Sequence, residues 1–393
     1  MKRLHDVRVL MYSHDTFGLG HLRRCRAIAH ALVERYKGVT VLIVSGSQIA
    51  GAFDFRARVD FVKIPSVIKL YSGEYASMAE HIDLEDTLAM REGLVRQTAA
   101  TFKPDLFIVD KEPLGLKGEV EATLIDCRMR GVPTVLGLRD VMDDPDALAR
   151  EWAARDTLDR VTSLYDEVWV YGPEGFFDPL TGMDVPARLA SRIRYTGFLR
   201  RDAAQPDEAA RGRILVTAGG GGDGARVMDA VLSAIEHDPG LPLAFTLVPG
   251  PFMATQERER IHRRVASLPS VEIVDFDAHL ESAVQSCAGL VGMCGYNTFC
   301  EVLSFDRPAL FLPRTRPRAE QLIRATRAAE MGWAQVLESE PAADPARMAA
   351  ALHALARAPR PSDAAYPPDL SGLDSVCHRV RDLTGRAHLD AAE

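Results

Sequence analysis

Short runs of apolar and β-branched residues alternate along the chain with longer segments whose apolar residues recur at helical spacing. In the first half these runs predict strands at residues 7–13, 39–45, 60–64, 105–110, 134–138, 167–171 and 194–197. In the second half they predict strands at residues 214–217, 244–248, 271–274, 289–292 and 309–312. Strands that alternate with helices in this way are typical of parallel α/β domains, in which helices cover both faces of a sheet.

The clearest helical pattern follows the first strand. One side of it carries an apolar stripe of Leu22, Cys25, Ala29, Leu32, Val33 and Tyr36, and the opposite side carries Arg23, Arg24, Arg26, His30 and Glu34. This spacing predicts an amphipathic helix with its apolar stripe on one side and its charged residues on the other.

The alternation breaks at residues 200–212, a polar segment that contains a proline. We interpret it as a linker between an N-terminal domain at residues 1–199 and a C-terminal domain at residues 213–358. Residues 359–393 then form a tail with a short helix. This organisation predicts two doubly wound Rossmann-like domains of the α/β class. Ligands of such domains bind outside the carboxyl ends of the strands, and two facing domains would place those ends across a central cleft.

The composition fits a globular protein and excludes some classes of function. The 393 residues are 47% apolar and 26% charged, and the net charge of −8 argues against a general nucleic-acid binder. The first residues lack a signal-peptide pattern, and no apolar run reaches the roughly 18 residues of a membrane span. We therefore expect a cytoplasmic protein.

Two further features of the sequence bear on ligands. The six cysteines form no C-x-x-C pair, so we expect buried thiols and no metal site built on them. Arginines crowd the segment from residue 314 to residue 327, which fits either a solvated helix face or a site that attracts phosphate or anionic lipid. The pattern leaves both interpretations open.

The loop after the first strand is the first candidate site. Gly18 and Gly20 permit a tight turn, and the helix that follows presents backbone N–H groups that could hold an anion. His21, at this junction, could accept a proton from a hydroxyl group or from water. A histidine that only supports the turn would fit the same pattern. A third glycine of a dinucleotide fingerprint is missing where Arg23 stands, so a nicotinamide enzyme is disfavoured.

A second glycine-rich loop follows the predicted strand at residues 214–217. It contains Gly219, Gly220, Gly221 and Gly222, and a helix opens soon after Gly224. No lysine follows, so the loop is not a P-loop of the Walker A type. Consecutive glycines before a helix favour a cradle for a diphosphate over a bare turn.

Two more loops carry polar residues after strands. Gly295 allows a turn, Asn297 and Thr298 suit the start of a helix, and Glu301 lies one turn further on. Such a start could hold a phosphate while the carboxylate accepts two ribose hydroxyls, but an ordinary capping box fits equally well. Glu320 and Gln321, which open the next helix, could bind sugar hydroxyls.

Taken together, these loops resemble the GT-B superfamily, and specifically family 28, which includes the N-acetylglucosaminyltransferase of the lipid-linked peptidoglycan precursor. That family has a glycine-rich loop, then a helix start of the form Gly-x-x-Thr-x-x-Glu, matched by Gly295, Thr298 and Glu301, and then a glutamine near the next helix, matched by Gln321. The resemblance implies that Glu301 binds the donor ribose. It also implies that residues 295–298 bind the diphosphate, that Gln321 and Glu320 bind the donor sugar, and that the backbone near Phe276 faces the base.

The N-terminal half matches this family less closely. Its short loop with Gly18, Gly20 and His21 also resembles the nucleotide-sugar hydrolase of pseudaminic acid synthesis, which uses the corresponding histidine with water. The later loops that contain Asp110 and Asp140 lack the peptidoglycan enzyme's pattern, and we keep both residues as candidates on the acceptor side.

The function expected from this resemblance is transfer of a sugar from a UDP-sugar donor to an acceptor hydroxyl, with inversion and without a cofactor or metal. The acceptor, a glycan or a lipid-linked molecule, would in the second case bring the protein to the inner face of the membrane. Hydrolysis of the donor and non-catalytic binding of a nucleotide sugar are the alternatives.

Overall fold

The structure is a computed structural model of the 393-residue chain. It describes residues 6–14, 20–69, 75–79, 81–202, 205–219, 222–275, 277 and 280–385. The chain divides into two compact units. Unit 1 comprises residues 1–199 and 371–393, and unit 2 comprises residues 200–370.

Unit 1 is built on a seven-stranded parallel sheet with the strand order β3-β2-β1-β6-β7-β8-β9. Its strands are β1 (Val7–Ser13), β2 (Val39–Ser45), β3 (Val59–Lys63), β6 (Leu106–Asp110), β7 (Thr134–Arg139), β8 (Glu167–Tyr171) and β9 (Ile193–Tyr195). The interior strands β6 and β8 are buried along their whole length. Such burial requires the nearly continuous apolar runs that predicted these strands, since both faces of a parallel sheet are covered.

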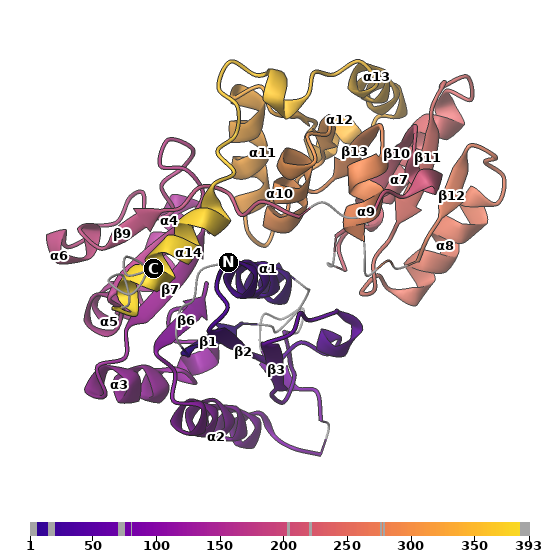
Figure 1. Ribbon diagram of the computed structural model, residues 1–393. Coiled ribbons are helices and arrows are strands. Elements are labelled where there is room, and N and C mark those ends of the chain that lie inside the picture. Colours follow the sequence, from indigo (N-terminus) through magenta and orange to yellow (C-terminus); the bar gives the residue numbers. More distant parts are fainter. Residues whose placement is uncertain are drawn as a thin grey trace. The chain divides into compact units, whose positions relative to one another are not determined.

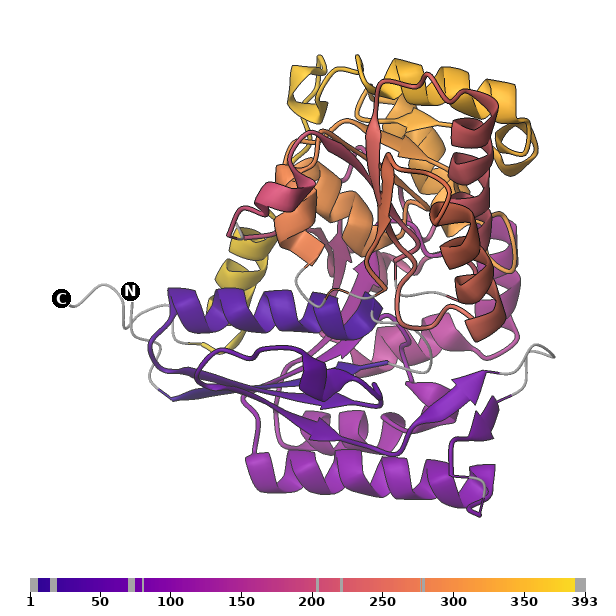
Figure 2. The same ribbon diagram turned by 90° about the vertical axis from the view of Figure 1, so that its right-hand side faces the viewer.

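Helices cover both faces of this sheet (Figures 1 and 2). The helices of unit 1 are α1 (Gly20–Arg35), α2 (Leu84–Phe102), α3 (Glu121–Met129), α4 (Pro145–Ala153), α5 (Thr157–Leu164), α6 (Ala187–Ala190) and α14 (Gly372–Leu383). Helix α1 lies on one face and α2 on the other. The predicted apolar stripe of α1 is buried, as expected. A small antiparallel hairpin of β4 (Val67–Lys69) and β5 (Tyr75–Ser77), which the sequence did not predict, precedes α2.

Unit 2 repeats the plan with a six-stranded parallel sheet in the order β12-β11-β10-β13-β14-β15. Its strands are β10 (Arg213–Thr217), β11 (Ala244–Val248), β12 (Val271–Ile273), β13 (Gly289–Gly292), β14 (Ala309–Phe311) and β15 (Gln335–Val336). Its helices are α7 (Ala225–His237), α8 (Thr255–Val265), α9 (Leu280–Ser286), α10 (Tyr296–Ser304), α11 (Glu320–Glu330), α12 (Ser339–Ala342) and α13 (Pro345–Leu355).

Alternation along the strands of unit 2 directs side chains to two separate cores. Ile214 and Val216 of β10 point toward the core shared with α7, α8 and α13. On α10, the ring of Phe299 lies edge-on to that of Phe311 in β14, with the centroids 6.2 Å apart. Two doubly wound α/β domains, as the sequence predicted, are therefore present.

The segment interpreted as a linker is attached to unit 2. The backbone N–H of Arg201 donates to Ser304 Oγ at 2.9 Å, and the N–H of Asp207 donates to Ser286 Oγ at 2.8 Å. Ala210 is buried at 3% exposure. The described part of residues 200–212 thus follows the surface of unit 2, because serine hydroxyls on α10 and α9 pair with its backbone.

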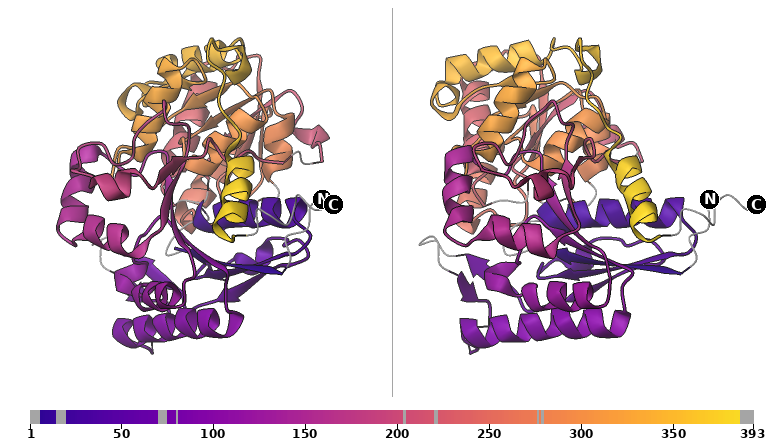
Figure 3. Two further views of the ribbon diagram at one scale, coloured as in Figure 1. Left: turned by 60° about the vertical axis from the view of Figure 1, so that its left-hand side comes forward. Right: turned by 90° about the vertical axis from the view of Figure 1, so that its left-hand side faces the viewer.

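The C-terminal tail is divided between the units. Residues 359–370 belong to unit 2, whereas α14 returns to unit 1 and packs beside α1 (Figure 3). Tyr36 Oη donates to the carbonyl of Cys377 at 3.1 Å. Leu199 and Ser371, where the chain leaves and re-enters unit 1, pair as an isolated antiparallel bridge. The N–H of Gly372 donates to the carbonyl of Phe198 at 3.1 Å.

Candidate functional site

The carboxyl ends of β1 and β6 form the switch point of unit 1. The chain places β2 and β3 on one side of β1 and then returns to place β6 on the other side. Ser13, which ends β1, is therefore the register partner of Asp110, which ends β6. Connections leave a sheet in opposite directions at such a point and open space for a ligand. His14 and His21 follow β1, so the fold brings both to the edge that holds Asp110.

His21 and Asp110 form a hydrogen-bonded pair in which Arg24 is the third member. His21 Nδ1 lies 2.6 Å from Asp110 Oδ2. Arg24 donates its Nε proton to Asp110 Oδ1 at 2.7 Å and an Nη2 proton to Oδ2. The side chains of Asp110 and Arg24 are 1% and 2% exposed, and that of His21 is 16% exposed. Arg24, which the helical pattern places opposite the apolar stripe, is nevertheless buried, because the Asp110 carboxylate provides a partner for its charge.

The charge states of this pair follow from burial and from the neighbouring ions. Burial lowers the pKa of His21 to about 3, although Asp110 acts in the opposite direction. Burial alone would raise the pKa of Asp110, but the charge of Arg24 and the hydrogen bond from His21 hold it well below its usual range. At neutral pH a neutral imidazole therefore faces a carboxylate. It donates its Nδ1 proton to Asp110, which leaves the Nε2 lone pair as a proton acceptor.

A second buried network, which the sequence did not reveal, adjoins this pair. The ring of His14 lies edge-on to that of His21, with the centroids 5.6 Å apart, and its Nδ1 is 3.3 Å from Tyr12 Oη. Tyr12 donates to Glu119, which accepts two further bonds from Arg91 at 2.6 and 2.7 Å. Burial lowers the pKa of His14 to about 4. The sequence feature that could have revealed this network is the group of polar residues at the end of the apolar run of β1.

The remaining candidates of unit 1 lie near the same edge or outside the described residues. Gly20 is the first residue of α1, and its carbonyl accepts a bond from Arg24 Nη1 at 3.4 Å. Asp140 follows β7, the strand beside β6, and is fully buried. Gly18 lies outside the described residues. Of these predicted residues, the structure shows His21 and Asp110 in direct contact.

In unit 2 the equivalent switch point lies between β10 and β13, where the glycine-rich loop and the loop before α10 begin. Gly219 has a φ of +66°, and its N–H donates to Thr217 Oγ1 at 3.1 Å. A Cβ on Gly250 would stand 2.3 Å from the carbonyl oxygen of Gly219, so two backbones pack directly on each other there. Gly222 is described, whereas Gly220 and Gly221 lie outside the described residues.

The start of α10 is fixed by contacts from other segments of unit 2. Gly295 is the N-cap in an extended conformation, with no side-chain cap bond among the described residues. Asn297 and Thr298, in the first turn, are each 8% exposed. Asn297 Oδ1 accepts a bond from Arg201 Nη2 at 2.7 Å, so its amide is already engaged. In general, the N–H groups of a helix's first turn are not used by bonds within the helix, and a helix start of this kind is where anions bind in many proteins.

The side chains expected to contact the ribose and the sugar are buried. Glu301 is fully buried, and Glu320 and Gln321 are 3% and 7% exposed. Glu320 accepts a bond from Arg314 Nη2 at 2.7 Å, and Gln321 Oε1 accepts the N–H of Arg314 at 3.2 Å. Phe276 lies outside the described residues.

The arginine-rich segment is not simply a solvated face, which was one of the two interpretations. Arg324 is fully buried, and its Nη1 donates to the carbonyl of Cys294 at 3.0 Å. Cys294 has a φ of +64°, so this bond supports a left-handed residue directly before α10. All six cysteines lie in the described part of the chain and are buried, as expected.

Comparison with known proteins identifies the fold. No family model matches the chain, and a search of curated proteins finds no match. Among solved structures, the chain aligns with a UDP-N-acetylglucosamine 2-epimerase over 99% of its length and 98% of that chain, with a TM-score of 0.62 and 13% identity. It aligns with the glycotransferase of kitacinnamycin over 98% of both chains, with a TM-score of 0.59 and 17% identity.

A third structure, MurG of Acinetobacter baumannii, aligns over 97% of this chain and 95% of that one, with a TM-score of 0.54 and 13% identity. All three alignments span both units. The chain has the GT-B fold. The resemblance read from the loops is thus confirmed at the level of the fold. At these identities the GT-B fold is what the chain shares with the three proteins, and their activities are their own.

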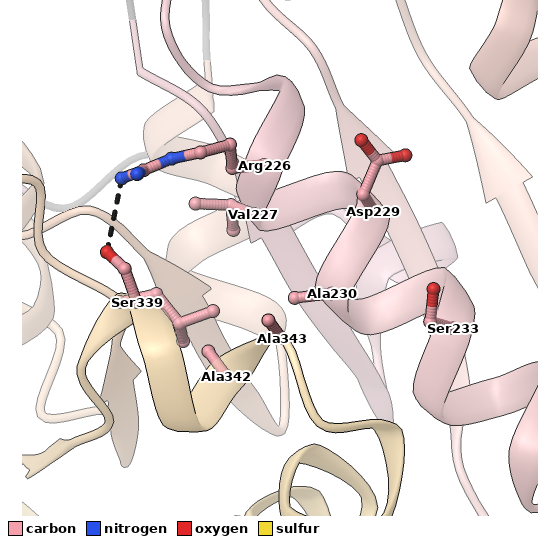
Figure 4. A pocket seen from close by; sticks show the side chains of 9 residues that line it. Arg226, Val227, Asp229, Ala230, Ser233, Ser339, Ala342 and Ala343 are labelled. Carbon is pink, nitrogen blue, oxygen red and sulfur yellow. Dashed lines mark hydrogen bonds between the residues drawn. The ribbon is translucent and has the colours of Figure 1, made fainter.

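Other features of the described residues are separate from these loops. A pocket in unit 2 lies between α7 and α12, where Arg226 Nη2 donates to Ser339 Oγ at 3.2 Å (Figure 4). None of the predicted site residues lines it. Within the described part of the chain, no helix is long and apolar enough to span a bilayer. No cluster of three or more potential metal ligands occurs among these residues.

Proposed function

We propose that this protein is an inverting glycosyltransferase that moves a sugar from a UDP-sugar donor to an acceptor hydroxyl. The observation that carries the proposal is the His21–Asp110 pair at the switch point of unit 1, in a chain with the GT-B fold. Unit 2 adds the glycine-rich loop and the start of α10, which suit a diphosphate. Two of the three structures described above are named as sugar-transferring or UDP-sugar enzymes, which supports this donor class.

In the proposed reaction His21 is the general base. Its Nδ1 proton is held by Asp110 at 2.6 Å, so Nε2 takes the proton of the acceptor hydroxyl. The freed oxygen attacks the anomeric carbon of the donor sugar from the side opposite the diphosphate, and the bond to the diphosphate breaks. The Asp110 carboxylate stabilises the imidazolium that forms, as in other base–carboxylate pairs.

The departing diphosphate gains negative charge, which unit 2 would stabilise. We assign this role to backbone N–H groups at the start of α10 and in the glycine-rich loop, because preorganised donors lower the energy of a charge that develops in the transition state. We assign this task to the main chain, so the proposed reaction needs no metal. Glu301 would hold the ribose, and Gln321 with Glu320 the sugar, as the resemblance to family 28 implies.

We propose only the chemical class of the acceptor: a compound with a hydroxyl group, either a glycan or a lipid-linked molecule. We propose that the reaction takes place in the cytoplasm. A lipid-linked acceptor would bring the protein to the inner face of the membrane.

Hydrolysis is the second candidate, because a water molecule could take the place of the acceptor hydroxyl at His21 Nε2. The GT-B fold is also shared by the epimerase described above, so the products have to be identified directly. Purified protein is incubated with UDP-glucose, UDP-galactose or UDP-N-acetylglucosamine, with and without candidate acceptors. UDP release is measured, and the sugar is identified by NMR.

If the protein is a transferase, UDP release should depend on the presence of an acceptor. An α-linked donor should then give a β-linked product. Acceptor-independent release of free sugar would instead establish the hydrolase. A sugar with inverted stereochemistry at C2 would establish the epimerase, and binding of UDP without turnover would establish the silent binding protein.

A further inference from the structure

One arginine connects the segments of unit 2 that the proposed function assigns to the donor. Arg314 follows β14, and its Nη1 donates to Asp223 Oδ2 at 2.8 Å. Its Nη2 donates to Glu320 Oε1 at 2.7 Å, and its backbone N–H donates to Gln321 Oε1 at 3.2 Å. Asp223 belongs to the glycine-rich loop, between Gly222 and Gly224. Arg314 therefore joins this loop to the start of α11.

The two carboxylates that hold Arg314 differ in their surroundings. The side chain of Glu320 is 3% exposed, whereas that of Asp223 is 41% exposed. Burial acts to lower the pKa of Arg314, but the charges of Glu320 and Asp223 outweigh burial and raise it. The guanidinium is thus permanently charged. The bond to buried Glu320 is fixed, and the bond to Asp223 is the one that solvent can replace.

The two described ends of this loop pack tightly against neighbouring residues of unit 2. A Cβ on Gly224 would stand 1.9 Å from the Cβ of Ala218, so the loop closes tightly there. At the other end, a Cβ on Gly250 would stand 2.3 Å from the carbonyl oxygen of Gly219, so the two backbones are in direct contact.

A carboxylate in a loop that cradles a diphosphate would repel the ligand unless its charge is compensated. Phosphate oxygens, in turn, are strong partners for a guanidinium edge, because charge-assisted bonds to phosphate can be made in parallel pairs. We propose that Asp223 occupies, in the ligand-free protein, the edge of Arg314 that the donor diphosphate takes when it binds. Arg314 is then a direct ligand of the diphosphate, and Asp223 is a built-in competitor. This inference rests on the proposed function.

The test is the affinity for UDP, measured by titration calorimetry at low salt on the full chain. Asp223→Asn removes the competitor and should tighten UDP binding by about two- to fivefold, the range expected for the release of an exposed ion pair. Arg314→Lys keeps the charge but loses the paired geometry, and Arg314→Gln loses both. Their affinities should fall in that order, by about tenfold or more for Arg314→Gln.

Two controls separate competition from a general change in charge or stability. Glu330→Gln removes one negative charge from another exposed ion pair of unit 2, in which Arg327 lies 2.8 Å away, and should leave UDP affinity unchanged. Uridine, which has no phosphate, should bind wild type and Asp223→Asn equally. Melting temperatures identify any variant that fails to fold.

Unchanged or weaker UDP binding by folded Asp223→Asn, with normal binding by wild type, would overturn the inference and leave the proposed function standing. Wild-type protein that binds no nucleoside diphosphate would overturn the proposed function and this inference with it.

Discussion

Asp110 determines which nitrogen of His21 carries the proton. Because Nδ1 lies 2.6 Å from the carboxylate, Nε2 is the atom left to act as a base. Loss of a positioned base slows turnover by about a hundred- to ten-thousand-fold. We expect His21→Ala to show a loss in this range, and Asp110→Asn to show a large part of it, with UDP affinity nearly unchanged because both residues lie in unit 1.

Turnover, UDP affinity and melting temperature measured on the same variants test this assignment. A histidine that merely supports the turn would lose melting temperature, with activity falling only in proportion to unfolded protein. A folded His21→Ala protein that keeps more than about a tenth of wild-type turnover would remove His21 from the mechanism.

The low pKa of His21 predicts an unusual response to pH. The pKa is about 3 in the folded protein, against 6.5 for an unperturbed imidazole, so the base stays unprotonated below neutrality. We expect kcat/KM to stay level as the pH falls from 8 to about 5, whereas a solvated base would lose activity near pH 6.5. An acid limb centred near 6.5 in the measured profile would contradict the buried state of His21.

The same shift makes the free energy of unfolding depend on pH. His14 and His21 have folded pKa values of about 4 and 3, below the 6.5 of the ordinary side chain. The unfolded chain therefore binds protons that the folded chain excludes, and stability is lost as the pH falls below about 6.5. Urea denaturation at pH 7 and pH 5 should show a lower free energy of unfolding at pH 5.

At this scale the sequence revealed some of the site. His21 and Asp110 could be identified because Asp110 ends an apolar strand and His21 lies at the start of the helix that follows one. The burial of Arg24 could not be predicted, because helical periodicity only placed it opposite the apolar stripe and its partner Asp110 lies 86 residues away along the chain. Arg91 and Glu119 likewise form a fully buried ion pair between residues that are distant along the chain. No local sequence pattern predicts such pairs.

Among the elements, α1 depends on a residue outside it for its C-terminal end. The guanidinium of Arg58 donates to the carbonyls of Tyr36, Lys37 and Val39 at 2.7, 2.8 and 2.9 Å, and also to that of Val33. Carbonyl groups at the end of a helix have no helical donor, and a cation there also interacts favourably with the helix dipole.

We expect Arg58→Ala to lower the free energy of unfolding by about 1–2 kcal/mol, since bonds to a charged donor are lost at a helix end. Arg347→Ala is the control, because this side chain is exposed and its ion pair with Asp344 is long, at 3.8 Å. Chemical denaturation of both variants measures the difference. Equal stability of the two variants would show that water replaces the Arg58 cap without cost.

Helix α10 carries the residue expected to hold the ribose. Glu301→Gln keeps the size of the buried side chain but removes its charge, and should weaken UDP binding by about 1.5–3 kcal/mol, the range for hydrogen bonds to charged groups. Calorimetry with UDP, alongside a melting curve, measures both effects. Unchanged UDP affinity in the folded variant would leave Glu301 as a structural residue of α10.

The elements themselves were largely predictable. The predicted strands at residues 39–45, 167–171 and 244–248 match β2, β8 and β11 at both ends, because buried parallel strands need uninterrupted apolar runs. Strand β15 spans only Gln335–Val336 and has no such run. The hairpin of β4 and β5 escaped prediction because Val67–Lys69 is too short to show alternation.

At the scale of the whole molecule, the chain re-enters unit 1 at Gly372, where the surrounding backbone leaves no room for a side chain. A Cβ on Gly372 would stand 2.4 Å from the carbonyl oxygen of Gly197 and 2.6 Å from that of Phe198. Gly372→Ala should therefore displace the start of α14 and lower the melting temperature. Gly93→Ala, in the middle of α2 with open space around the new Cβ, should raise stability by about 0.4–1 kcal/mol.

If Gly372→Ala lowers stability while Gly93→Ala raises it, the loss at Gly372 comes from the steric contact and not from alanine itself. Differential scanning calorimetry measures both variants. A Gly372→Ala protein as stable as wild type would show that α14 can shift without loss.

The pairing of Leu199 with Ser371 has a consequence for how the chain can be divided. Unit 2 departs from and rejoins unit 1 at two neighbouring residues, so residues 200–370 are topologically an insertion. Facing Cα atoms of an antiparallel pair lie about 4.5–5.5 Å apart, a gap that a tight turn closes. Joining Leu199 to Ser371 would excise the inserted unit with α14 still in place. The same junction offers a site at which the corresponding unit of another protein with the GT-B fold could be grafted, to test whether the proposed donor preference follows unit 2 while His21 and Asp110 stay unchanged.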